Sequence, residues 1–191
     1  GRSRAFCSII YPWLKEHFAP RLDHVTEDDF YRMINKSEPS LIRTEADELT
    51  YCLHIMVRYE LEKRMFDGSL TAHDLPAEWN RLYKEYLGID VPDDRQGVLQ
   101  DSHWANGNIG YFPSYAIGSA YGAQYLQEMS RDLDVDAVVR SGDLTPINNW
   151  LEDRIWKHGC MKDPVALFES VCGKFDPACY VAYLEKKFTE V

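Results

Sequence analysis

The sequence has 191 residues, 45% hydrophobic and 27% charged, which is enough apolar material for the core of one ordinary domain. Its formal net charge of -10 argues against general binding to nucleic acids or anionic membranes, because clustered Lys and Arg bind phosphate groups. No apolar run is long enough to span a bilayer. We therefore expect a globular protein without nucleic-acid or membrane partners.

The cysteines and histidines show no spacing typical of a disulfide framework or a metal site. Five cysteines at irregular spacings predict free thiols that pack in the core. No two histidines have the spacing that puts two ligands on one helical face, and HExxH is absent. We expect no metal site from this chain alone. Because the chain opens with Gly1-Arg2-Ser3 rather than Met, we expect its natural start to lie upstream.

The periodicity of the first half is helical. It predicts a helix over 5–18 that kinks or restarts at Pro12, and a second helix from a capping residue, Thr26, to position 35 or 36. The longest helix is expected from Arg43 to about Met65, with an apolar stripe at helical spacing formed by Leu49, Leu53, Met56, Val57 and Leu61. A further helix is expected over 74–87, with Pro76 in its first turn and Gly88 at its end.

The second half begins with a region that lacks sustained periodicity, over 89–110, and this predicts a long structured loop. Helical patterns return over 112–132, 136–140, 146–158, 164–172 and 177–188, and a proline stands at or near the first turn of the last three. No repeat, linker or low-complexity tract interrupts the chain. The fold class we expect is all-α, with residues 1–191 forming a single all-helical unit.

The stretch 97–121 is the strongest candidate for a functional site. It places an acid, a histidine and several tyrosines among glycines, and tyrosine and tryptophan combine an apolar body with a polar tip that needs a hydrogen-bond partner. An isolated histidine near an aromatic is more often a core residue whose hydrogen bonds are satisfied. The polar and aromatic residues around His103 favour a functional role instead. The candidates are Gln100, Asp101, His103, Trp104, Tyr111 and Tyr115.

A second candidate is Arg43, four residues before Asp47. The simplest interpretation is an exposed ion pair on one helical face, which would contribute only tenths of a kcal/mol. A functional Arg43 would instead be partly buried, held by Asp47 or another acid, and would direct its guanidinium to a substrate carboxylate. Asp101 has two interpretations of its own: it orients the ring of His103, or it caps the next turn.

The motifs Ile42-Arg43-x-x-Ala46-Asp47 and Gly97-x-x-Gln100-Asp101-x-His103-Trp104 resemble the two signature motifs of the thermostable carboxypeptidase Taq family of HExxH metallocarboxypeptidases. Their order and spacing also agree with that family. Cys7 and Ser102 depart from its usual pattern, at positions where the chemistry needs no particular residue. Further agreement covers essentially the whole chain: Gly1-Arg2-Ser3, Phe6, Leu49-Thr50-Tyr51, Asp74-Leu75-Pro76, Trp79-Asn80, Tyr86-Leu87-Gly88, Gly110-Tyr111-Phe112-Pro113, Tyr183-Leu184 and Lys187.

The resemblance implies a cytoplasmic peptidase that releases single C-terminal amino acids from peptides with a free C-terminus. It implies zinc, with cobalt as a substitute, water activated by the metal, and a homodimer at full length. Family members are more than twice this length and carry the HExxH helix and a further glutamate ligand upstream of the segment that resembles Gly1-Arg2-Ser3. We therefore expect this chain to be a C-terminal wall of the grooved helical enzyme, inactive alone, with no metal ligand of its own.

Carried over residue by residue, the resemblance makes Arg43 the group that receives the C-terminal carboxylate of the substrate. His103 and one tyrosine would donate to the substrate carbonyl and the developing oxyanion. We favour Tyr115 as the catalytic tyrosine and Tyr111 as a substrate-side neighbour. The supporting residues would be Asp47, Gln100, Asp101 and Trp104. The rival interpretation is a non-catalytic helical module that binds peptide C-termini through Arg43, or a vestigial one.

Overall fold

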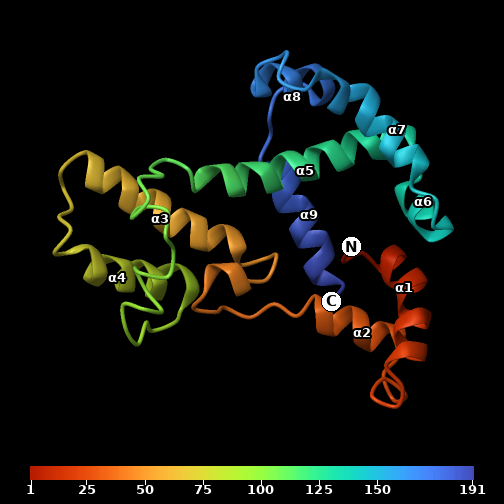
Figure 1. Cartoon of the computed structure of the whole chain (residues 1–191), viewed down its shortest axis with the longest axis horizontal. Helices are drawn as coiled ribbons and strands as arrows, with labels where there is room; N and C mark the ends of the chain where they lie inside the picture. Colours follow the sequence, from red (N-terminus) through yellow and green to blue (C-terminus); the bar gives the residue numbers. More distant parts are fainter. The chain divides into compact units, whose positions relative to one another are not determined.

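The computed structural model describes residues 1–191 and is helical, with no β-strand (Figure 1). This confirms the all-α prediction. None of its helices combines the length and the apolar character that crossing a bilayer requires. The helices in chain order are α1 (Arg4–His17), α2 (Glu27–Ile34), η1 (Arg43–Glu45), α3 (Tyr51–Phe66), α4 (Leu75–Leu87), α5 (Pro113–Asp132), α6 (Val135–Ser141), α7 (Thr145–Arg154), η2 (Trp156–His158), α8 (Pro164–Cys172) and α9 (Ala178–Thr189).

Most helix ends lie where local sequence signals predict them. Thr26 and Asp29 form a reciprocal capping box at the start of α2. Gly88 ends α4 in the left-handed conformation, at φ 74°, which a residue with a Cβ rarely adopts. Prolines occupy the first turn of α4, α7 and α8, where the missing N–H costs no hydrogen bond. The segment 89–110 contains no helix, as predicted.

The helix predicted from Arg43 is wrong at its beginning. Residues 43–45 form the 3-10 turn η1, Ala46 is extended at ψ 144°, and α3 begins only at Tyr51. The cause is the side chain of Asp47, whose Oδ1 accepts the backbone N–H groups of Leu49 (2.9 Å) and Thr50 (3.0 Å) and so forms a turn in place of helix. The longest helix is therefore α5, with 20 residues, rather than α3, with 16.

The contacts divide the chain into two compact units. Unit 1 comprises Gly1–Lys36 and Ala120–Val191, and unit 2 comprises Ser37–Ser119, so that the division falls within α5. Because a division by contacts does not decide whether the parts fold separately, the prediction of one all-helical unit stays a prediction.

The core of unit 2 lies between α3 and α4, which run side by side (Figure 1). Gly97 is needed where the long loop meets this core, since a Cβ there would come within 2.8 Å of Cγ1 of Val91. Such close packing holds the loop, and with it the 97–104 motif, against the two helices. The buried core residues are Val57, Leu61, Leu70, Trp79, Leu82, Tyr83, Leu87 and Val98.

In unit 1, α1 packs against α2 and α6, and α7 contacts η2. Tyr121 of α5 stacks on Phe168 of α8 with ring centroids 3.9 Å apart. The amide of Gln124 bonds to the backbone at Cys172, Lys174 and Asp176, which fixes the segment between α8 and α9. All five cysteines are free, but only Cys7 is buried, so the predicted core role holds for Cys7 alone.

Candidate functional site

Arg43 is buried in unit 2, with a side chain only 8% exposed, so it is not part of an exposed ion pair. Its Nε and Nη2 donate to Oδ1 of Asp101 at 3.1 and 2.7 Å, and its Nη1 donates to the hydroxyl of Tyr51 at 3.1 Å. A guanidinium carries five N–H donors. Two of those on Arg43, one on each Nη, therefore have no acceptor in the chain and remain for a ligand.

Asp101 joins two arginines rather than one. Its second oxygen, Oδ2, accepts from Nε of Arg58 at 2.7 Å and forms an ion pair with Nη2 of Arg58 at 2.5 Å. Burial alone would raise the pKa of Asp101, but the hydrogen bonds and charges of Arg43 and Arg58 outweigh it and hold the pKa below its usual value. Asp101 is therefore an anion fixed between two guanidinium groups.

Gln100 ties this arginine group to the backbone. Its Oε1 accepts the backbone N–H of Arg43 and Nη2 of Arg58, both at 2.9 Å. Its Nε2 donates to the carbonyl oxygens of Leu41 (3.0 Å) and Gln96 (2.9 Å). One half-buried amide thus fixes the backbone where Arg43 begins the η1 turn.

His103 and Tyr115 are hydrogen-bonded, with Nε2 of the ring 3.0 Å from the tyrosine hydroxyl. The ring of His103 also packs on Phe112, with centroids 4.5 Å apart. Its Nδ1 lies 3.8 Å from Oδ1 of Asp101, too far for a hydrogen bond. Asp101 therefore forms neither of the two bonds considered for it from sequence, since it caps no turn either. Tyr111 is 50% exposed, with its ring edge-on to Tyr115 at 5.3 Å.

Trp104 is held by a buried carboxylate on α3. Its Nε1 donates to Oε1 of Glu62 at 2.7 Å, and the same oxygen accepts the backbone N–H of Gly110 at 3.2 Å. The indole is edge-on to the rings of Trp79 and Phe112. Glu62 thus holds Trp104 and Gly110, the two ends of the turn that directly follows His103.

The predicted pairing of Asp47 with Arg43 is wrong. Asp47 accepts instead from Thr50, from the Ser37 hydroxyl (2.9 Å) and from the backbone N–H of Glu38 (3.1 Å). Burial alone would raise the pKa of Asp47, but these neutral donors outweigh it and hold the pKa below its usual value. Because Arg43 is outside the helix, the two side chains do not share a helical face, and Asp47 shapes the turn before α3.

Sequence reasoning missed the polar side of α3. Arg58 and His54 are 0% exposed, and Tyr83 of α4 lies beside them, with its hydroxyl 3.1 Å from Nδ1 of His54. Two members of the predicted apolar stripe, Leu49 and Met56, are exposed instead. A usable signal was present, because His54, Arg58 and Glu62 recur every four residues on the side of Val57 and Leu61.

His54 is a buried titratable group whose pKa is strongly shifted by the fold. Burial, followed by the charges of Arg58 and Arg43, lowers its pKa from 6.5 to about 4. The unfolded chain therefore binds a proton between pH 6.5 and pH 4 that the folded chain does not. Its contribution to stability is fully present above pH 6.5 and is lost as the pH falls toward 4.

We expect the free energy of unfolding of the full-length protein to fall by about 2 kcal/mol from this group when the pH is lowered from 7 to 5. Urea unfolding at the two pH values measures the change. His54→Gln should remove that part of the pH dependence, whereas His24→Gln, at an exposed histidine, should retain it. An unchanged pH dependence in His54→Gln would contradict the assignment.

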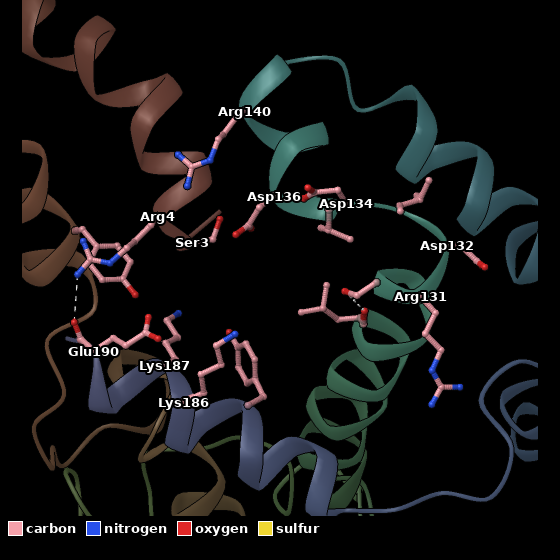
Figure 2. Close-up of a pocket in the computed structure, with 16 residues that line it drawn as sticks. Ser3, Arg4, Arg131, Asp132, Asp134, Asp136, Arg140, Lys186, Lys187 and Glu190 are labelled. Carbon is pink, nitrogen blue, oxygen red and sulfur yellow. Dashed lines mark hydrogen bonds between the residues drawn. The ribbon is translucent and has the colours of Figure 1, made fainter.

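The residues of this chain do not fit a metal site. No group of three or more His, Cys, Asp or Glu side chains is arranged to hold an ion. A separate pocket of about 750 Å³ lies in unit 1, among α1, α6, α9 and the end of α5 (Figure 2). Both basic and acidic side chains line it, and none of the predicted site residues does. The candidate site is therefore the group in unit 2.

A sequence profile of the carboxypeptidase Taq (M32) metallopeptidase family matches residues 1–188. The chain belongs to this family. The M32 family consists of metallopeptidases, so membership in it implies a metal cofactor. "Carboxypeptidase 1" of Bacillus subtilis is 42% identical over 100% of this chain and 38% of its own length. "Thermostable carboxypeptidase 1" of Thermus thermophilus is 43% identical over 98% of this chain and 37% of its own length.

The M32 fold extends over the whole chain. The crystal structure of an M32 carboxypeptidase from Deinococcus radiodurans R1 matches with a TM-score of 0.96 and 37% identity, over 100% of this chain and 39% of that chain. The "BsuCP" crystal structure matches with a TM-score of 0.92 and 42% identity over 99% of this chain. The chain thus spans about 38% of the length of its relatives and corresponds to a C-terminal portion of the M32 enzyme.

Proposed function

We propose that this chain supplies the wall of an M32 metallocarboxypeptidase that binds the C-terminal carboxylate and the oxyanion of the substrate. The observation that carries the proposal is Arg43, buried and clamped by Asp101, with two N–H groups left without an acceptor. A buried guanidinium with two free donors matches a carboxylate, which accepts two parallel hydrogen bonds. Such a group selects the free end of a peptide and so favours the release of single C-terminal amino acids.

His103 and Tyr115 are the proposed donors to the reacting carbonyl. They share a hydrogen bond in the same unit, and Phe112 lies against the ring of His103 and 5.7 Å from the guanidinium carbon of Arg43. Donors fixed before the substrate binds stabilise the charge that develops in the transition state. Tyr111, more exposed and edge-on to Tyr115, is proposed to contact the substrate beside the reacting bond.

The metal of the proposed enzyme is zinc, held by ligands outside this chain, and it supplies the activation of the attacking water. The residues of this chain do not fit a metal site, so their proposed part in the reaction is to bind and orient the substrate. The proposal includes a cytoplasmic enzyme, a homodimer at full length, and a chain that needs those outside ligands for turnover.

The test uses the full-length protein and one short peptide in two forms, with a free C-terminus and with a C-terminal amide. We expect zinc-dependent release of the last amino acid from the acid, with kcat/KM at least about 100-fold lower for the amide, because the amide cannot accept two charge-assisted hydrogen bonds. Amino-acid analysis of the products measures the release. Binding of the acid without release would instead favour the non-catalytic peptide-binding module, and equal cleavage of both forms would contradict carboxylate recognition.

A further inference from the structure

The buried group around Asp101 carries an uncompensated positive charge. It contains two guanidinium groups, of Arg43 and Arg58, and only one carboxylate. The other carboxylates nearby, Asp47 and Glu62, accept from neutral donors and form no ion pair with either arginine. Burying a charge is costly unless it is paired, so a site with this composition favours one incoming anion.

Arg58 cannot itself contact that anion. Its Nε donates to Asp101, its Nη2 donates to Gln100 and is ion-paired with Asp101, and its Nη1 donates to the carbonyl oxygen of His54 at 2.7 Å and to the hydroxyl of Tyr83 at 3.5 Å. Each nitrogen of its guanidinium therefore already has an acceptor in the chain. Its guanidinium carbon also lies 4.6 Å from the centre of the Trp79 ring, and its side chain is 0% exposed.

What Arg58 changes is the charge that Arg43 presents. If Asp101 paired with Arg43 alone, the two opposite charges would cancel and leave little attraction for a substrate carboxylate. With Arg58 on the other carboxylate oxygen, Asp101 still fixes the guanidinium of Arg43, but the group as a whole keeps one positive charge. Asp101 thus orients Arg43, and Arg58 offsets the charge of Asp101.

We propose that Arg58 is a positioning residue that keeps Asp101 from neutralising Arg43, and so maintains the affinity of the site for a free peptide C-terminus. This inference rests on the proposed function, in which Arg43 binds the carboxylate. It adds a residue outside both signature motifs that acts without touching the substrate. The quantity it controls is the preference for a peptide acid over the matching amide.

The experiment measures that preference in the full-length zinc protein, as the ratio of the inhibition constants of an N-acetyl dipeptide amide and the matching acid. Arg58→Met should lower the ratio about 10- to 100-fold, the range set by one charge-assisted interaction, and should raise KM for peptide acids more than it lowers kcat. Arg58→Lys, which keeps the charge, should lower the ratio less. Arg81→Met removes an exposed charge from α4 and serves as the matched control, with an unchanged ratio.

The decisive variant is the double substitution Arg58→Met with Asp101→Asn, which removes the two opposite charges together and leaves Arg43 uncompensated. We expect the double variant to recover at least half of the decrease that Arg58→Met causes in the logarithm of the ratio. A residue with a merely structural role would not be rescued by a second change in its own site. A double variant as impaired as Arg58→Met, or an Arg58→Met variant with a wild-type ratio, would overturn the inference.

Folding and the proposed function are controlled separately. Circular dichroism establishes that each variant is folded. If Arg58→Met alone is unfolded, the double variant and Arg58→Lys carry the test: each should have a ratio closer to that of the wild type than to that of Arg43→Met, and a double variant with a ratio as low as that of Arg43→Met would overturn the inference. Arg43→Met is measured in parallel. If Arg43→Met keeps the wild-type ratio, the proposed function itself fails. If Arg43→Met loses the ratio while Arg58→Met keeps it, only the role of Arg58 fails.

Discussion

Replacing Arg43 with methionine should lower kcat/KM for a peptide acid by about 100- to 1000-fold in the full-length enzyme, because loss of one partner of a buried charged interaction costs about 2–5 kcal/mol. The two N–H groups that have no acceptor in the chain are lost with the side chain. Cleavage of the corresponding amide should change little, since it does not use the charge. Steady-state kinetics on the acid and the amide measures both effects.

The Arg43→Met variant should also remain folded. Without Arg43, Asp101 keeps its hydrogen bond and its ion pair with Arg58, so no buried carboxylate is left unpaired. Arg43→Lys is the matched control, because lysine keeps the charge but cannot form two parallel hydrogen bonds, and its loss should be intermediate, about 10-fold. A folded Arg43→Met variant that still prefers the acid would contradict the role of this residue.

The helix ends and the long loop could be predicted because their causes are local. The capping box at Thr26, the left-handed glycine at position 88 and the prolines in first turns each act within four residues of the helix end that they define. The two motifs also drew attention to residues that the structure brings together, since Arg43 and Asp101 are in direct contact.

The polar side of α3 could not be predicted in the same way. Arg58 is buried because Gln100 and Asp101, more than forty positions away along the chain, accept its hydrogens. An apolar stripe is chosen from apolar residues alone, so it omits a charged side chain whose partners lie in a distant loop. For the same reason the sequence predicts that Arg43 pairs with its neighbour Asp47, whereas in the structure it pairs with the distant Asp101.

Tyr115 should contribute more to turnover than Tyr111, although both belong to the same short segment. Its hydroxyl is fixed 3.0 Å from Nε2 of His103, whereas Tyr111 is half exposed and packs on Tyr115 through its ring. A donor that is held in place before the reaction needs no reorientation in the transition state. A solvent-exposed hydroxyl lacks that advantage.

We therefore expect Tyr115→Phe to lower kcat of the full-length enzyme by about 100- to 1000-fold, with KM changed only a few-fold, the loss typical of removing one oxyanion donor. Tyr111→Phe, which removes the same atom four residues earlier, is the matched control and should change kcat by less than about 10-fold. Stopped-time assays of amino-acid release on a peptide acid separate kcat from KM. If the large loss follows Tyr111→Phe instead, the oxyanion donor is Tyr111, and the hydrogen bond between Tyr115 and His103 serves only to orient the histidine ring.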